Sequence, residues 1–253
     1  MPPLALVTGG MHRLGAAIAA RLAAAGYTLA LHKHHAADPA PELAAALADH
    51  GTEWHRFRAD LGLANEVKGL IPRIVDHFGR APDLLVNNAA LFGEGDWEAL
   101  TTADLDRMTA VNHRAPVLLA QALVAASPPG NQPAIVNILD QRVANPVPDQ
   151  LAYSLSKGAL FQATRTLAVA FGNRARVNAV APGLTIITPD YSAAQTGRLA
   201  ARMPIGRLPT PTDVADAVLF LASAKATTGQ TIFVDGGASL APLGRDFVYL
   251  ERD

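Results

Sequence analysis

The sequence contains no cysteine and few charged or aromatic residues. Without thiols there is no disulfide framework, thiolate zinc site or cysteine nucleophile, so redox chemistry would need a borrowed cofactor. Charged residues make up 17% of the 253, against about 25% in typical domains. The 21 Lys and Arg residues nearly balance the 22 Asp and Glu residues. This near-neutrality provides no net field to attract nucleic acid or a membrane surface, so we expect neither partner, and any anion site must be local.

The sequence also lacks long apolar runs. No run reaches the roughly 18 uninterrupted apolar residues that a membrane span requires. The N-terminus has no basic region before the Gly9-Gly10 turn and no cleavage-site pattern, so we expect no signal peptide. Half of the residues are hydrophobic, which is enough for a sizeable core. We therefore expect a soluble, cytoplasmic protein.

Short runs rich in Val, Ile and Leu alternate with longer Ala- and Leu-rich segments of helical period. This alternation is typical of βαβ units and predicts an α/β Rossmann fold, a doubly wound seven-stranded parallel sheet with helices on both faces. We expect strands at Leu4–Thr8, Thr28–His32, Glu53–Arg58, Asp83–Val86, Ala134–Leu139, Arg176–Ala181 and Gln230–Val234. We expect helices at Leu14–Ala25, Pro41–His50, Ala64–Phe78, Thr102–Ala126, Leu151–Gly172 and Pro211–Ala222.

The organisation of the chain is that of one domain, residues 1–253, because no linker-like or repeated stretch divides it. The connection at residues 182–209 is the longest without a strand, and we expect it to be a substrate loop. Residues 238–253 form a C-terminal tail. In open parallel sheets ligands bind beyond the carboxyl ends of the strands, where the strand order reverses. Residues that follow strands are therefore the candidate site residues.

A glycine turn follows the first strand and opens a helix. It contains Gly9, Arg13, Leu14 and Gly15. Free backbone N–H groups and the positive end of the helix dipole suit a diphosphate, and glycines permit its close approach. The spacing is not the G-x-G-x-x-G form, so an ordinary loop remains the alternative.

The second strand ends in a cluster of basic residues, where an NAD-binding protein usually places an acid for the ribose 2′-hydroxyl. The cluster is His32, Lys33, His34 and His35. With Arg13 as a further cation, this edge favours a 2′-phosphate, so we expect NADP as the cofactor. Solvated strand-end cations are the alternative. A metal site is disfavoured because no Asp, Glu or Cys joins the histidines at ligand spacing, and we expect none.

Tyr153 and Lys157 lie four positions apart near the start of an expected helix, so they share one face. A cation near a tyrosine hydroxyl lowers its pKa from about 10 toward neutrality, which lets the phenol act as a general acid or base in hydride transfer. Such a pair also occurs by chance in many helices, so it needs the support of other features.

Taken together, these features resemble the short-chain dehydrogenase/reductase family from Leu4 to about Gly237. The resemblance implies a proton donor at Tyr153, a ribose contact at Lys157 and a relay water at Asn112. It further implies an adenine contact at Asp60 and cofactor contacts at the positions that follow the other strands, which are Leu61, Asn88, Ala89, Pro182 and Gly183. It also implies a homotetramer. The apolar tail residues Phe247–Leu250 either dock on a neighbouring subunit or lie on their own chain.

Two departures from the usual family pattern narrow the subgroup. Asp140 stands thirteen positions before Tyr153, where a serine usually polarises the substrate carbonyl, and Arg13 replaces a glycine of the turn. In both departures the sequence resembles the pteridine reductases, including the bacterial dihydromonapterin reductases. Phe92 falls where those enzymes stack a pterin, and Leu184 also matches, whereas Ala90 departs from a serine of the parasite enzymes.

These residues predict an NADPH-dependent reductase of a pterin, of the dihydromonapterin or dihydrobiopterin type. A carboxylate at Asp140 can help deliver a proton to a ring nitrogen, and Phe92 can orient a flat ring. Asp140 could instead cap backbone N–H groups, and Phe92 could be an ordinary loop residue. The alternative enzyme is a ketone or 3-oxoacyl thioester reductase with the same cofactor. A non-catalytic NADP-binding sensor is the third hypothesis.

Overall fold

A computed structural model describes residues 1–35, 38–93, 97–241 and 243–252 of the chain. Its centre is one parallel sheet of seven strands in the order β3-β2-β1-β4-β5-β6-β7. All seven expected strands are present, with ends that differ by at most one residue. The strands are β1 (Leu4–Val7), β2 (Thr28–Lys33), β3 (Trp54–Arg58), β4 (Leu84–Asn87), β5 (Ala134–Ile138), β6 (Arg176–Pro182) and β7 (Thr231–Val234).

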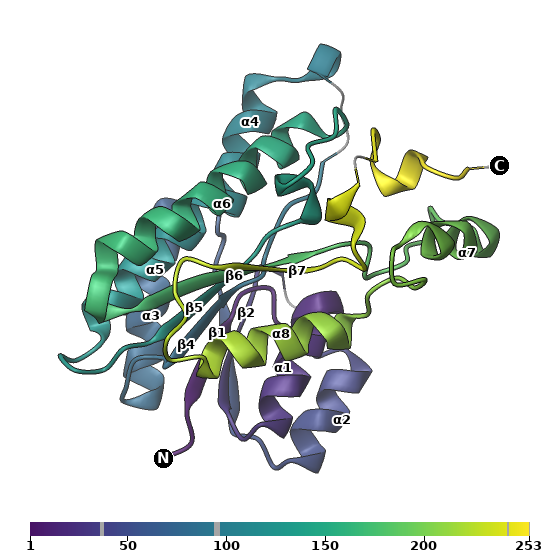
Figure 1. Cartoon of the computed structure of the whole chain (residues 1–253). Coiled ribbons are helices and arrows are strands. Elements are labelled where there is room, and N and C mark those ends of the chain that lie inside the picture. Colours follow the sequence, from purple (N-terminus) through teal and green to yellow (C-terminus); the bar gives the residue numbers. More distant parts are fainter. Residues whose placement is uncertain (36–37, 94–96, 242, 253) are drawn as a thin grey trace.

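Helices cover both faces of this sheet, as the sequence predicts (Figure 1). One face packs against α1 (Arg13–Ala24), α2 (Pro41–Asp49) and α8 (Pro211–Ser223). The other packs against α3 (Ala64–Phe78), α5 (Ala115–Ala126) and α6 (Leu151–Phe171). Each face has its own buried cluster of aliphatic side chains, so β1, β2, β4, β5 and β6 are buried throughout. This layering explains why these strands consist largely of Ala, Val, Ile and Leu.

The strand order fixes where a ligand can bind. The chain winds outward from β1 through β2 to β3, then returns to the other side of β1 with β4. The order therefore reverses between β1 and β4, and the loops after these strands diverge there. Residues that follow β1, β4, β5 and β6 lie together around the resulting crevice.

Two helical segments differ from the sequence prediction. The single helix expected at Thr102–Ala126 is interrupted: α4 (Thr102–Thr109) and α5 flank a wider π-helical turn at Ala110–Arg114. The expected loop at residues 182–209 contains α7 (Ala193–Arg202). Ser192 caps α7 by accepting a hydrogen bond from the Gln195 amide at 3.0 Å. A serine followed three residues later by glutamine is a helix-start signal that the sequence already carried.

The C-terminal tail lies on its own chain, beside α7 (Figure 1). Phe247 is buried against Leu199 and Met203, from α7 and the residue after it. Of the apolar tail residues, Phe247 thus packs on its own chain. Within the described residues, no helix has the length and apolar character needed to cross a bilayer.

Candidate active site

The glycine turn after β1 is shaped by two backbone requirements. Gly9 has φ +62°. Arg13, at the first position of α1, has φ +53°, a backbone conformation that residues other than glycine rarely adopt. Gly15 has no room for a side chain, because a Cβ there would lie 2.0 Å from the Gly9 carbonyl oxygen. Among the described residues, no side chain caps the N-terminus of α1 at His12. The free N–H groups of this first turn are therefore available to an anion.

His32 has a different role from the predicted one. It is buried, its Nδ1 accepts a hydrogen bond from the Gly9 amide at 3.2 Å, and its Nε2 lies 3.0 Å from the Ala59 carbonyl oxygen. Burial lowers the pKa of His32 to about 4, so the ring is neutral. The prediction that His32 offers positive charge to a 2′-phosphate is therefore wrong. Instead, His32 stabilises the glycine turn by accepting a hydrogen bond from its backbone.

Asn88, after β4, holds the other side of the turn. Its Nδ2 donates to the Thr8 carbonyl oxygen at 2.9 Å and to the Gly9 carbonyl oxygen at 3.3 Å. The backbone amides of Asn88 and Ala89 both donate to the Thr8 hydroxyl. These bonds fix the ends of β1 and β4 against each other at the point where the strand order reverses.

A cavity of about 700 Å³ runs from the glycine turn to the end of β5. It is lined by residues that follow several strands, as expected for a dinucleotide in this fold. Most of the predicted cofactor residues are among them: Gly9, Arg13, Leu14, Gly15, Lys33, His34, Asn88, Ala89, Tyr153, Lys157, Pro182 and Gly183. The sequence did not single out the further lining residues Met11, His12, Ile138, Thr185 and Ile186.

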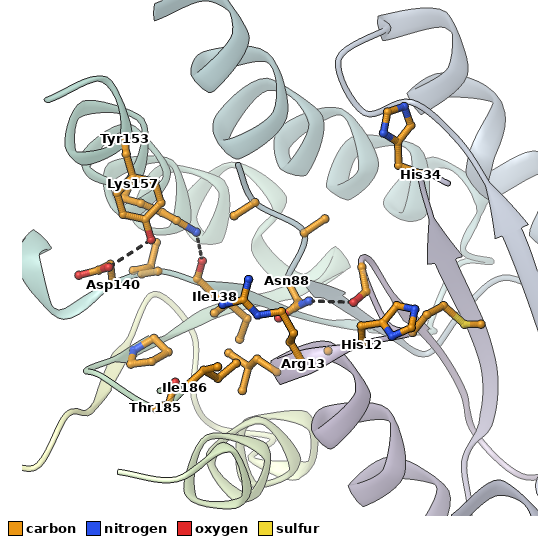
Figure 2. Close-up of a pocket in the computed structure, with 18 of the residues that line it drawn as sticks. His12, Arg13, His34, Asn88, Ile138, Asp140, Tyr153, Lys157, Thr185 and Ile186 are labelled. Atoms are coloured by element: carbon orange, nitrogen blue, oxygen red, sulfur yellow. Dashed lines mark hydrogen bonds between the residues drawn. The ribbon is translucent and has the colours of Figure 1, made fainter. Parts of the chain in front are cut away.

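Two of the residues predicted to bind the 2′-phosphate, Arg13 and His34, do not lie together. His34 stands at the outer end of the cavity, whereas the Arg13 side chain extends toward Ile138 in its middle (Figure 2). His34 Nε2 is 3.6 Å from the Asp60 carboxylate. An anion at the outer end would therefore meet His34 and Lys33 first, and Arg13 only after its side chain turns.

Besides His32, three of the residues predicted to contact the cofactor or relay protons are not among those that line the cavity. Asp60 receives the Gly62 amide at 2.8 Å, and Leu61 is buried beside it. Asn112, in the π-helical turn, binds the backbone of Leu91 through both side-chain atoms, at 2.8 and 2.9 Å. Its Nδ2 also donates to the Ser156 hydroxyl at 3.0 Å. Asn112 thus ties the loop after β4 to α6.

The structure brings Asp140, Tyr153 and Lys157 together at the end of β5 (Figure 2). The Tyr153 hydroxyl donates to Asp140 Oδ2 at 3.1 Å. Lys157 Nζ donates to the Ile138 carbonyl oxygen at 2.7 Å. An ammonium has three donors, so this bond leaves donors for ribose hydroxyls in the adjoining cavity.

The electrostatics of this group differ from the sequence expectation. Burial and the Asp140 carboxylate raise the pKa of Tyr153 well above its usual value, and Arg142 only partly opposes them. The expectation that Lys157 lowers the Tyr153 pKa toward neutrality is therefore wrong. Burial lowers the pKa of Lys157 to about 8. Tyr153 is consequently protonated near neutral pH.

A second cavity, of about 750 Å³, adjoins the first where Asp140, Tyr153 and Gly183 line both. Phe92 lies at its edge with 58% of its surface exposed, and its ring meets the Tyr153 ring edge-on at 4.8 Å. Phe92 is therefore not part of the core. The other walls come from the loop after β6 and the C-terminal tail, including Leu184, Thr188, Asp190, Tyr191, Val248, Tyr249 and Arg252.

The sequence did not single out Arg142, which contacts two of the candidate site residues. Its backbone amide and Nε both donate to Asp140 Oδ1, at 2.9 and 3.2 Å. Its guanidinium lies 5.8 Å from the centre of the Phe92 ring and 5.0 Å from that of Tyr153. The only sequence signal was its place two residues after Asp140. Asp140 thus caps a backbone N–H, as one interpretation held, and also contacts Tyr153.

A dinucleotide-sized crevice beside a buried tyrosine and lysine and a half-buried carboxylate defines an oxidoreductase of the Rossmann class. The family model described as enoyl-(acyl carrier protein) reductase matches residues 10–239. The chain belongs to the short-chain dehydrogenase/reductase family, as its sequence motifs predict.

The relatives within this family act on different substrates. The chain is 37% identical to a putative ketoacyl reductase 2 of the granaticin polyketide synthase from Streptomyces violaceoruber, over 94% of this chain and 96% of the other. It is 35% identical to pteridine reductase 1 of Leishmania tarentolae, with the same coverage. The structure of FolM alternative dihydrofolate reductase 1 from Brucella canis, complexed with NADP, has a TM-score of 0.86 and 39% identity, covering 94% and 95% of the two chains.

Proposed function

We propose that the protein is an NADPH-dependent reductase that reduces a C=N bond of a pterin, of the dihydromonapterin or dihydrobiopterin type. The observation that carries this proposal is the contact between Asp140 Oδ2 and the Tyr153 hydroxyl at 3.1 Å, beside the exposed ring of Phe92. Resemblance to pteridine reductase 1 and to the Brucella enzyme supports it.

Asp140 suits a ring nitrogen better than a ketone. Reduction of a ketone builds negative charge on the substrate oxygen, and a carboxylate beside that oxygen would repel it. Reduction of a C=N bond instead requires a proton at nitrogen. A pterin also carries N–H groups, which can donate hydrogen bonds to a carboxylate. Asp140 can therefore hold the substrate and orient the acid that protonates it.

Phe92 supplies a flat apolar surface at the mouth of the substrate cavity. Its exposed ring is inclined at 67° to the ring of Tyr153 and is free to stack on an aromatic heterocycle. A planar ligand on Phe92 would lie next to both Tyr153 and Asp140, which line the same cavity. This arrangement favours a bicyclic substrate over a flexible acyl chain.

NADPH would supply the hydride when it is bound in the first cavity. The glycine turn fits a diphosphate, because no side chain caps the described N-terminus of α1 and the N–H groups of its first turn are available to an anion. Lys157 would hold the ribose near the nicotinamide, and Lys33 and His34 would meet a 2′-phosphate at the outer end. Tyr153 would donate its proton to the ring nitrogen, and Asp140 would keep the Tyr153 hydroxyl aimed at it.

Oxidation of NADPH, followed by its absorbance, tests the substrate. We expect dihydrobiopterin or dihydromonapterin to accelerate oxidation, and a 3-oxoacyl thioester to do so weakly. Asp140→Ser should reverse this preference, because serine can donate to a developing alkoxide. Absence of any pterin-dependent oxidation would reject the proposal.

The second candidate is a ketone or 3-oxoacyl thioester reductase with the same cofactor. Similarity to the granaticin ketoacyl reductase favours it. Faster turnover of a ketone than of any pterin by the unchanged protein would select this candidate. A non-catalytic NADP-binding sensor remains the third, and tight NADPH binding without turnover of any carbonyl or imine would select it.

We also propose a homotetramer. Large apolar side chains are exposed on two separate faces: Leu155 and Val169 on α6, and Phe220 and Phe233 on α8 and β7. Since α6 and α8 cover opposite faces of the sheet (Figure 1), burying both patches requires two different contacts. Two different two-fold contacts per subunit generate a closed tetramer. Light scattering coupled to gel filtration measures the mass, and a monomer would contradict the proposal.

A further inference from the structure

The C-terminal tail is anchored next to the catalytic carboxylate by ion pairs. Asp246 is buried, accepts the Val248 amide at 3.0 Å and pairs with Arg142 Nη2. Arg142 is itself 4% exposed and pairs with Asp140 through Nε. One buried guanidinium therefore bridges a tail residue and the carboxylate that contacts Tyr153.

The same tail segment grips the start of α6. The Asp246 amide donates to Asp149 Oδ2 at 2.6 Å, and Arg245 Nη2 lies 2.7 Å from Asp149 Oδ1. Gln150, which begins the helix with φ +48°, accepts from Arg142 Nη1 at 3.1 Å. The tail and Arg142 thus hold the end of the helix that carries Tyr153.

The division of bonds on Asp140 is what the tail controls. Arg142 occupies Oδ1, which leaves Oδ2 for the Tyr153 hydroxyl. A guanidinium tends to bind a carboxylate through two parallel bonds. Asp246 prevents this by holding the Nη2 edge of Arg142. Without Asp246, Arg142 would be able to engage both oxygens of Asp140 and displace Tyr153.

We propose that Asp246 is a positioning residue for the reductase reaction, acting through Arg142 to keep Asp140 Oδ2 on the Tyr153 hydroxyl. This inference rests on the proposed function, because it requires Asp140 and Tyr153 to act together. It makes the tail part of the active-site framework as well as a wall of the substrate cavity.

The charged groups around Arg142 and Tyr153 determine in which direction the loss of Asp246 changes the pKa of Tyr153. Arg142 faces Asp140, Asp246 and Tyr153, while Asp246 also faces Asp149. On the other side, Lys157 faces Asp140. Burial raises the pKa of Tyr153 most, Asp140 adds to this, Arg142 opposes it and Asp246 raises it further. Neutralising Asp246 therefore lowers the pKa of Tyr153.

The test compares Asp246→Asn with Glu251→Gln in the full-length protein. Glu251 lies in the same tail but pairs with Arg202 on the surface, so it is a matched control. For Asp246→Asn we expect kcat to fall by about 10- to 100-fold, since small misplacements of a reacting group cost this much. We also expect the alkaline limb of its pH profile to move to lower pH. Glu251→Gln should match the wild type in both.

If Asp246 were only a structural anchor, Asp246→Asn would lower the stability of the protein and leave the alkaline limb of the pH–rate profile in place. That result would overturn the proposal. If Asp246→Asn does not fold, Arg142→Lys replaces it. An ammonium keeps the charge but cannot hold two carboxylates in the fork geometry, so the same loss of kcat is expected. Unchanged kcat in a folded Arg142→Lys protein would also overturn the proposal.

Failure of the proposed function is recognised separately. If the wild type reduces a ketone and no pterin, the pterin proposal fails, and the variants are compared on the ketone. If the wild type reduces neither substrate, crystal structures of the NADP complexes of the wild type and of Asp246→Asn test the inference instead. Loss of the contact between Asp140 and Tyr153 in Asp246→Asn supports the inference, and its retention near 3.1 Å rejects it.

Discussion

At the scale of single residues, Tyr153 keeps its proton because of its neighbours. Burial and the adjacent Asp140 carboxylate both oppose formation of the phenolate, so the pKa of Tyr153 is raised. In Asp140→Asn the charge is removed while an oxygen remains to accept the hydrogen bond. We expect the alkaline limb of kcat/KM for NADPH-dependent reduction to move to lower pH in this variant. An unmoved limb in the pH–rate profile would show that Asp140 does not control Tyr153.

Lys157 gives a second prediction, on stability. The folded protein releases this proton near pH 8, because burial lowers the pKa from 10.5, whereas the unfolded chain holds it to about 10.5. Between these values the unfolded state binds more protons, so this group makes the free energy of unfolding rise with pH. Urea unfolding at several pH values should show that rise in the wild type relative to Lys157→Met. A pH-independent difference between the two proteins would contradict it.

His32 shows where inference from single residues stops. The sequence places it at a strand end among basic residues, which favours a phosphate role. In the structure β2 is buried on both faces, so His32 turns beneath the glycine turn while Lys33 and His34 line the cavity. Which way a strand-end side chain points depends on packing from both layers, and that is not visible in the local sequence.

At the scale of elements, the glycine turn depends on close contact between its own backbone segments. Replacing Gly15 by Ala would place a Cβ 2.0 Å from the Gly9 carbonyl oxygen. Overpacking of this kind costs about 1–3 kcal/mol, which corresponds to about 5- to 150-fold in affinity if the turn opens. We expect NADPH to bind Gly15→Ala more weakly by such a factor, measured by fluorescence titration.

Gly69→Ala is the control for that experiment. Gly69 lies within α3 with no atom within 4 Å of its added Cβ, among the described residues. Alanine is favoured over glycine in a helix by about 0.5–1 kcal/mol, so this variant should be slightly stabilised and bind NADPH normally. Equal binding by both variants would show that the contact at Gly15 is not needed for the cofactor.

The elements themselves were largely predictable from the sequence. Largely apolar runs between helical segments located the five strands that are buried throughout, as expected for strands covered on both faces. The sequence also located β3 and β7, which are only partly buried. The π-helical turn was not predictable, since Ala110–Arg114 continues the helical pattern on both sides. The bond from Arg142 to Asp246 spans 104 positions, and neither local spacing nor composition indicates such a pair.

At the scale of the whole molecule, the two exposed apolar faces can be separated by mutation. Val169 is 84% exposed on α6, and Phe220 is 56% exposed on α8. A charge in a buried apolar contact is strongly unfavourable, so Val169→Glu and Phe220→Glu should each break one contact and give dimers. The double variant should be monomeric. Light scattering checks the masses, and tetramers in all three variants would place the subunit contacts elsewhere.

The π-helical turn has a consequence for how the chain tolerates deletions. A π turn holds about one residue more than an α turn, so removing one residue there restores a regular helix and leaves both flanks in phase. Deleting Val111 should therefore preserve the packing of α4 and α5, and with it the circular dichroism spectrum. The deletion would turn the Asn112 side chain away from the Leu91 backbone, and its two hydrogen bonds there would be lost. If the spectrum is preserved, the extra residue serves to direct Asn112 toward the loop after β4 and is not required for the packing of the helix.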